Sequence, residues 1–188
     1  LDVLHSLMCA HTIPSQTTVT SPIMNGSTDP ELVRLRSSGG ASDADWDRYA
    51  AAQNRPFWSS TFIYYGPPKV IAAQWEHTKD RLAGIAGVAF REMASYTFPL
   101  TDEQADAVPD KPRLGIPSLN LFGSRNAPGA QPSEGHLDFS PMIPPRGEEL
   151  IALADVTGKI YADLGLTPTF VGGLMFHPRT MICFHAVP

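Results

Sequence analysis

"PFWSSTFIYYG" (56–66) is followed by "KVIAAQWEHTKDRLAGIAG" (69–87) and then "VAFREMASYTF" (88–98). The first segment is rich in aromatic and β-branched residues and stops at Gly66–Pro67, which predicts a strand. The second segment has apolar residues at roughly helical spacing, namely Val70, Ala73, Trp75, Leu82 and Ile85, and Gly87 suits its end. The third segment predicts a second strand. Together they predict a strand–helix–strand unit.

The second half of the chain repeats this pattern. "GHLDFSPM" (135–142) predicts a strand, and "GEELIALADVTGKIYADLG" (147–165) predicts a helix. The apolar stripe of that helix comprises Leu150, Ala154, Thr157, Tyr161 and Leu164. "TPTFVGGLMF" (167–176) and "RTMICFHAV" (179–187) predict two more strands, and Gly172–Gly173 indicates a bulge or a close approach of the backbone. We therefore expect an α+β domain, with a largely antiparallel sheet, helices on one face and ferredoxin-like units.

The remaining segments predict less regular structure. Residues 1–28 are expected to be mostly extended or loop-like, and residues 99–134 to form a long connection that contains a short helix in "TDEQADAVP" (101–109). Helices should begin at Thr28 or Asp29 with Pro30 in the first turn, and at Ser42 with Asp45 three residues later.

Length and charge exclude several classes of protein. The 188 residues suffice for one domain, and a net charge of −5 without a Lys/Arg cluster argues against a nucleic-acid partner. No apolar run has the length of a membrane span. Two cysteines that lie far apart in the sequence predict no disulfide framework. This favours an intracellular location, either cytoplasmic or peroxisomal. The start without Met and the end within an expected strand predict that residues 1–188 are one domain of a longer polypeptide.

His136 and Asp138 are the candidate site residues that need explaining. Alternate residues of a strand point to the same face, so these two share one face, whereas Leu137 and Phe139 form the expected core face. The residue types alone leave three interpretations open for His136 and Asp138: a solvated edge, a metal pair or contact with a ligand.

Other residues support weaker hypotheses. A metal site needs further ligands, for which His177 and His185 are candidates, but no recognised spacing supports it. Cys183 with His185 as its base lacks any sign of an oxyanion hole. Arg179 is either an anion ligand or a surface ion-pair partner. Trp58, Tyr64 and Tyr65 either line an aromatic pocket or form the two faces of a half-buried strand.

Five segments, taken in order, resemble the cap (substrate-binding) domain of FAD-dependent oxidases of the vanillyl-alcohol oxidase and 4-cresol methylhydroxylase type. They are "LHSLMCAHTIPSQTTVTSPIM" (4–24), "FIYYGPPKVIAAQWEHTKDRL" (62–82), "LGIPS" (114–118), "GHLDFSPMIPPRGEEL" (135–150) and "YADLGLTPTFVGGLMFHPRTMICF" (161–184). The fourth is the most specific, because it is similar to a Gly-(Gly/Ala)-His-x-x-Phe-Ser-Pro pattern before a Gly-Glu helix start.

The resemblance implies roles for particular residues. In histidyl-linked members, the histidine at the position of His136 binds the FAD covalently, through the 8α-methyl group of the flavin ring. Asp138 departs from the family pattern, which has an aromatic residue there. It is expected either to act as a base or hydrogen-bond partner for the substrate hydroxyl or to tune the pocket for a more polar substrate. Cys183 and Phe184, and less strongly Val171, are expected to line the substrate pocket.

The resemblance also implies an activity that this chain shares with a missing domain. Para-substituted phenols or aromatic alcohols would lose a hydride to FAD, and molecular oxygen or an electron-carrier protein would reoxidise the flavin. The FAD-binding domain of the same polypeptide would complete the enzyme, so this segment alone should be inactive; a homo-oligomer is compatible. Two alternatives remain open: a non-catalytic ferredoxin-like binding or regulatory module without a cofactor, and a metal-dependent hydrolase that uses His136 and Asp138.

Overall fold

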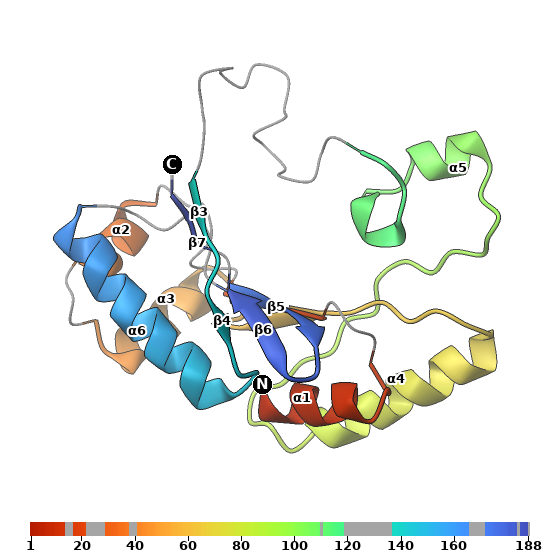
Figure 1. Ribbon diagram of the computed structural model, residues 1–188, viewed down its shortest axis with the longest axis horizontal. Helices are drawn as coiled ribbons and strands as arrows, with labels where there is room; N and C mark the ends of the chain where they lie inside the picture. The colour runs from red at the N-terminus through yellow and green to blue at the C-terminus, as the bar shows by residue number, and fades with distance from the viewer. Residues whose placement is uncertain are drawn as a thin grey trace. The chain divides into compact units, whose positions relative to one another are not determined.

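The computed structural model describes residues 1–13, 17–21, 29–37, 41–109, 111–118, 137–165, 172–183 and 185–187 (Figure 1). The chain divides into two compact units. The first unit comprises Leu1–Val88 and His136–Pro188, and the second comprises Ala89–Gly135.

The first unit contains two antiparallel sheets. The larger sheet has the strand order β2-β1-β5-β6-β4 and the smaller pairs β3 with β7. Their bounds are β1 Thr17–Thr20, β2 Ser59–Thr61, β3 Leu137–Phe139, β4 Met142–Ile143, β5 Gly172–His177, β6 Thr180–Cys183 and β7 His185–Val187. The predicted antiparallel α+β fold is thereby confirmed, although the strand expected over residues 56–66 pairs only at β2.

The two sheets share one register where they meet. In the smaller sheet Phe139 lies opposite His185, and in the larger sheet Met142 lies opposite Ile182. Between these pairs the backbone N–H of Cys183 donates to the carbonyl oxygen of Pro141 at 2.9 Å. The arm β3–β4 therefore runs antiparallel to the arm β6–β7 without a slip, although the strand pairing is interrupted between them (Figure 1).

One face of the larger sheet carries the main core. Opposite residues of an antiparallel pair and alternate residues of one strand share a face. The register Val19–Gly173–Cys183 and the neighbouring register Thr17–Met175–Met181 therefore lie on the same side. Side chains from three helices cover this side, namely Leu4, Leu7 and Met8 of α1 (Asp2–Cys9), Leu82 of α4 (Pro68–Leu82) and Leu150 of α6 (Gly147–Asp163). This arrangement agrees with the expected packing of helices on one face.

The glycine pair in β5 marks a close approach of three strands, as its sequence context predicted. A Cβ atom on Gly173 would lie 2.3 Å from Met181 Cε and 2.9 Å from the carbonyl oxygen of Ile182. Gly172 has a φ of +155°, and its Cβ would lie 2.4 Å from the carbonyl oxygen of Val19. Both positions exclude a larger residue without movement of the neighbouring backbone.

Two short helices form a second, smaller core. α2 (Pro30–Ser37) and α3 (Asp43–Ala52) bury Leu32, Leu35, Tyr49 and Ala50, with Trp46 and Phe57 at the margin. Asp29 accepts a hydrogen bond from the backbone N–H of Glu31 at 2.8 Å, and Ser42 forms a capping box with Asp45. Both expected helix starts are confirmed.

Residues 1–28 are the clearest error of the sequence interpretation. Asp2–Cys9 form helix α1 rather than an extended segment, and Leu4, Leu7 and Met8 on one side of it are buried. Their i, i+3 and i+4 spacing is typical of a helix. The prediction was wrong because it gave more weight to the β-branched residues that follow in the sequence. Among the described residues of this region, the expected extended or loop-like structure is confirmed for residues 10–13, which form turns and a bend, and for β1.

The buried stripes of the two long helices differ from their predicted composition. In α4, Leu82 and the hydroxyl-bearing Thr78 are buried, whereas Val70 is about half exposed, as is Ile85 beyond the helix end. In α6 the predicted stripe is buried at Leu150, Thr157 and Tyr161, but Leu164 lies beyond the helix end and is 65% exposed. Thr78 and Thr157 tolerate burial because each hydroxyl donates to a carbonyl oxygen one turn earlier.

The second unit has little regular structure in its described residues, 89–109 and 111–118. Residues 89–98 belong to none of the described strands, so the strand predicted over 88–98 is wrong. The expected short helix is present as α5 (Asp102–Asp106), which Thr101 and Gln104 cap reciprocally. A single 3-10 turn, η1 (Pro112–Leu114), ends at Gly115 in the left-handed conformation.

Candidate functional site

The "GHLDFSPM" segment is positioned by the shared register of the two sheets. Leu137, Asp138 and Phe139 form β3, in which Asp138 lies opposite Ala186 of β7. Pro141 then accepts the backbone hydrogen bond of Cys183, and β4 follows. The structure thus brings together the two sequence segments that were predicted to contribute to one site.

Helix α6 begins directly after this segment and is held from a distant part of the chain. The backbone N–H of Gly147, the first helical residue, donates to the Asp2 carboxylate at 3.3 Å. An acidic side chain at this end is favourable, because the first turn of a helix has unpaired N–H groups. The start of α1 and the start of α6 are therefore tied to each other.

Three of the five predicted site residues lie outside the described residues: His136, Val171 and Phe184. For Asp138 the structure gives the backbone position in β3. The predicted roles of these four residues remain predictions.

Cys183 is buried in the main core. Its side chain is 1% exposed, and it is clustered with Val19, Met175 and Met181. Burial raises the pKa of the thiol to about 11, because an apolar environment disfavours the thiolate. The proposal that Cys183 acts as a nucleophile loses its physical basis, since the thiolate is the reactive form. Its predicted contact with a substrate remains a prediction that would need the core to open at this point.

Phe139 corrects the expected core face of β3. This residue was predicted to be buried together with Leu137, yet it is 59% exposed. Strand alternation alone misassigned it because β3 pairs only with β7 in the described residues and lies outside the five-stranded sheet. An alternating pattern predicts burial only where a second layer covers the strand.

The side of the larger sheet opposite the main core forms a surface that we call the outer face. By register and alternation it carries Thr18, Thr20, Ser59, Thr61, Met142, Thr180 and Ile182. Met142 is 70% exposed and the other six side chains are half-buried. All seven side chains are uncharged. If the alternation of the strands is continued along the shared register, position 138 falls on the same side as positions 142 and 182. Cys183 falls on the opposite side. We call this agreement or disagreement of sides the register parity.

The outer face fits one part of FAD and not the whole molecule. An uncharged surface of small hydroxyl and aliphatic side chains suits a planar, uncharged ring system. The pyrophosphate of FAD requires backbone N–H groups at a glycine-rich turn or cationic side chains. Neither occurs among the seven residues of the outer face, so this face suits only the ring end of the cofactor.

Aromatic residues in and just before α4 pack against one another. Phe62, Tyr64 and Trp75 contact one another at ring-centroid separations of 5.6–6.4 Å. The Tyr64 hydroxyl lies 2.7 Å from Thr78 Oγ1, and burial raises the pKa of this tyrosine. Trp58 and Tyr65, which were predicted with Tyr64 as pocket candidates, are 39% and 61% exposed.

The described residues contain no group of three or more His, Cys, Asp or Glu side chains arranged to hold a metal ion. His177 Nδ1 instead accepts a hydrogen bond from the backbone N–H of Arg179 at 3.2 Å, which stabilises the β5–β6 turn.

Among the helices that the structure describes, none combines the length and apolar character needed to cross a bilayer.

Comparison with known proteins shows a similarity of fold. No family model matches the sequence. A crystal structure of p-cresol methylhydroxylase with substrate bound matches with a TM-score of 0.66 and 20% sequence identity. The match covers 99% of this chain and 35% of that chain, so this chain spans about a third of the length of the protein it matches. The α+β fold described above is therefore the fold of a segment of a p-cresol methylhydroxylase structure.

Proposed function

We propose that this chain is the cap domain of a flavin-dependent oxidoreductase that oxidises para-substituted phenols or aromatic alcohols. The observation that carries the proposal is the fold similarity to p-cresol methylhydroxylase over 99% of this chain. The five segments that resemble the same class of oxidase, in the same order, support it at the level of the sequence.

The outer face supplies the structural part of the proposal. The seven side chains named for it are uncharged and at least partly exposed, and position 138 shares its register parity with Met142 and Ile182 of this face. We therefore assign the outer face to the flavin ring and substrate. Val171 and Phe184, which lie outside the described residues, are added as pocket residues on the family resemblance alone. Ile182 joins this set on geometric grounds, whereas Cys183 belongs to the opposite, core-facing register.

His136 and Asp138 have different proposed roles. His136 would hold the FAD covalently through its imidazole, which prevents loss of the cofactor. When bound, FAD supplies the two-electron acceptor for a hydride from the benzylic carbon. Asp138 would accept the proton of the substrate hydroxyl, or bind that hydroxyl without taking its proton. A carboxylate suits either role because it accepts hydrogen bonds and titrates below neutral pH.

The FAD-binding domain of the same polypeptide is the proposed partner. The chain matches about a third of p-cresol methylhydroxylase, and its outer face lacks groups for the pyrophosphate. The isolated segment should therefore neither bind FAD tightly nor turn over a phenol. Molecular oxygen or an electron-carrier protein would reoxidise the complete enzyme.

The test is anaerobic reduction of the flavin in the complete polypeptide. Adding a para-alkylphenol such as 4-methylphenol should bleach the oxidised flavin band, while an alkylbenzene without the hydroxyl should leave it unchanged. If a flavin is present but no phenol or aromatic alcohol reduces it, the proposed substrate class is wrong. If the complete polypeptide contains no flavin, the proposed function itself is wrong.

A further inference from the structure

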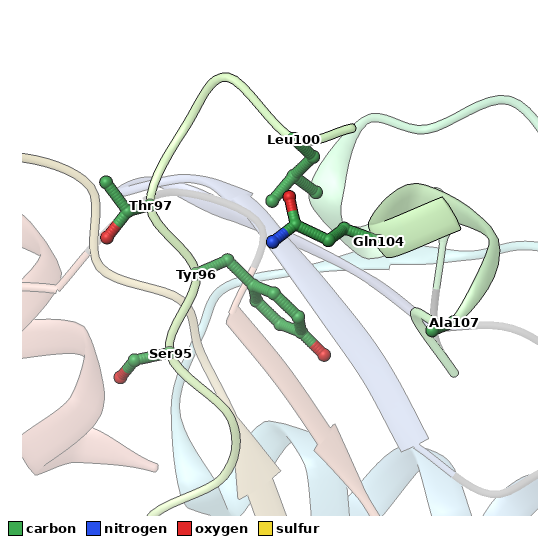
Figure 2. A pocket seen from close by; sticks show the side chains of 6 residues that line it. All are labelled: Ser95, Tyr96, Thr97, Leu100, Gln104 and Ala107. Atoms are coloured by element: carbon green, nitrogen blue, oxygen red, sulfur yellow. The ribbon is translucent and has the colours of Figure 1, made fainter. Parts of the chain in front are cut away.

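A hollow in the second unit lies within residues 95–107, apart from the residues discussed so far. Its volume is about 330 Å³, and it is lined by Ser95, Tyr96, Thr97, Leu100, Gln104 and Ala107 (Figure 2). The irregular segment from Ser95 to Leu100 forms one wall and α5 with its C-cap residue Ala107 forms the other. Both walls belong to the same unit, so the hollow is defined by local structure alone.

The capping of α5 determines which atoms of Gln104 are available to a ligand. The backbone N–H of Thr101 donates to Gln104 Oε1 at 2.9 Å. Because a donor must face an acceptor, this bond identifies the amide oxygen and leaves Nε2 as the other atom. Figure 2 shows this nitrogen and the Tyr96 ring pointing into the same space. The hollow therefore presents an aromatic ring beside an oriented pair of N–H donors.

The lining also defines the size and charge of a ligand. None of the six lining side chains is charged, and Leu100 and Ala107 add aliphatic surface. A volume of about 330 Å³ is at the lower end of the range for small-molecule sites, which suits one ring rather than a nucleotide. A neutral ring could pack against Tyr96, and a carbonyl or hydroxyl oxygen on it could accept from Gln104 Nε2.

We propose that this hollow binds a small neutral aromatic molecule that carries a hydrogen-bond acceptor. Tyr96 would contact the ring and Gln104 Nε2 would bind the acceptor (Figure 2). The proposal does not rest on the proposed function, because none of these residues belongs to the outer face or to the predicted flavin site.

The test is binding of benzamide to the full chain in the absence of flavin, measured by ligand-observed saturation-transfer NMR. A nine-atom ligand in an open site should bind with a Kd of about 1–10 mM. Cyclohexanecarboxamide is the matched ligand, since it keeps the amide but has no aromatic ring. It should bind at least about threefold more weakly.

Three variants make the test specific. Gln104→Glu keeps an oxygen for the Thr101 cap but removes the N–H donors, so benzamide binding should weaken about fivefold. Tyr96→Leu removes the ring and should weaken binding by a similar factor. Tyr65→Leu makes the same change at an exposed tyrosine outside the hollow and should leave binding unchanged.

Several outcomes would overturn the proposal. They are no benzamide binding at 50-fold the expected Kd, equal binding of the two amides, or equal weakening by Tyr65→Leu and Tyr96→Leu. Circular dichroism shows whether each variant is folded. If Tyr96→Leu fails to fold, Gln104→Glu decides alone, because the capping interaction that it retains keeps α5 intact.

Discussion

The backbone N–H of Cys183 donates to the carbonyl oxygen of Pro141 at 2.9 Å, at the point where one sheet gives way to the other. This bond keeps the arm that contains Asp138 in register with the last strands of the chain. It also decides which residues share a face. Cys183 points into the core with Met181, while Ile182 between them belongs to the outer face.

The burial of Cys183 predicts a dependence of stability on alkaline pH. The folded thiol has a pKa of about 11, raised from its ordinary value of 9.0, so between these values the folded state binds more protons than the unfolded state. The contribution of the buried thiol to the free energy of unfolding is therefore fully present below pH 9, and it falls as the pH rises towards 11. Urea unfolding midpoints at pH 8 and pH 10.5 should differ less in Cys183→Ala than in the unmodified chain.

Burial also raises the pKa of Tyr64 and Tyr161, so their ionisation lowers the stability of the protein at alkaline pH as well. Both tyrosines are present in Cys183→Ala and in the unmodified chain, so the difference between these two proteins reports the thiol alone. The same slope in Cys183→Ala and in the unmodified chain would show that the thiol does not titrate between these limits. Exposed Cys9 serves as the internal control, since Cys9→Ala should leave the slope unchanged.

Gly173→Ala should destabilise the first unit by about 1–3 kcal/mol, since the new methyl group would meet Met181 Cε and the carbonyl oxygen of Ile182. The methionine end can move, but the strand carbonyl cannot move without disturbing the β5–β6 pairing. Gly158→Ala in α6 is the matched control. Its Cβ meets nothing within 4 Å, so helix propensity predicts a gain of up to about 1 kcal/mol. Equal effects of both changes in chemical denaturation would contradict the strand geometry.

Asp29 should matter more than an exposed residue near a helix start normally does. Its carboxylate accepts from the backbone N–H of Glu31 at 2.8 Å and from the Tyr49 hydroxyl at 3.1 Å, so it joins α2 to α3. Asp29→Ala should cost about 1 kcal/mol, measured by chemical denaturation. Asp29→Ser keeps a capping oxygen and should recover part of this loss. Full stability in Asp29→Ala would show that the cap contributes nothing.

Asp138→Asn separates the two proposed roles of this residue in the complete polypeptide. If the carboxylate is the base, anaerobic flavin reduction by a phenolic substrate should slow by roughly 100-fold or more. If it only adjusts pocket polarity, the reduction rate should change little and the preferred substrate should shift. Asp155→Asn, on the exposed side of α6, is the control and should behave like the unmodified protein. Unchanged rate and unchanged substrate range would remove Asp138 from the site.

The sequence predicted those elements whose local signals agree with their surroundings. The helices at 68–82 and 147–163 have long periodic patterns, and Asp29 and Ser42 are helix caps with a direct hydrogen-bonding reason. The close approach at Gly172–Gly173 was also predicted, because glycine inside a strand pattern usually marks a bulge or a backbone contact that a side chain would block. The order of the family-like segments predicted the fold that the comparison then showed.

Properties that depend on neighbouring layers were not predictable in this way. The alternation in "LDF" cannot reveal that Phe139 lies beyond the five-stranded sheet, and the pattern in residues 88–98 cannot supply a partner strand. The burial of Cys183 follows from the register that β6 shares with β4 and β5, which no local pattern specifies. The hollow beside Tyr96 depends on how two segments approach each other, and the sequence analysis missed it.

The most direct test of the account is the intact mass and visible spectrum of the complete natural polypeptide after denaturation, with His136→Ala as the control. The account predicts a mass increase of one FAD and a flavin band that denaturation does not remove, both absent from the variant. A flavin that dissociates on denaturation would keep the oxidoreductase proposal but remove the covalent role of His136. A complete polypeptide without any flavin, bound or released, would contradict the account.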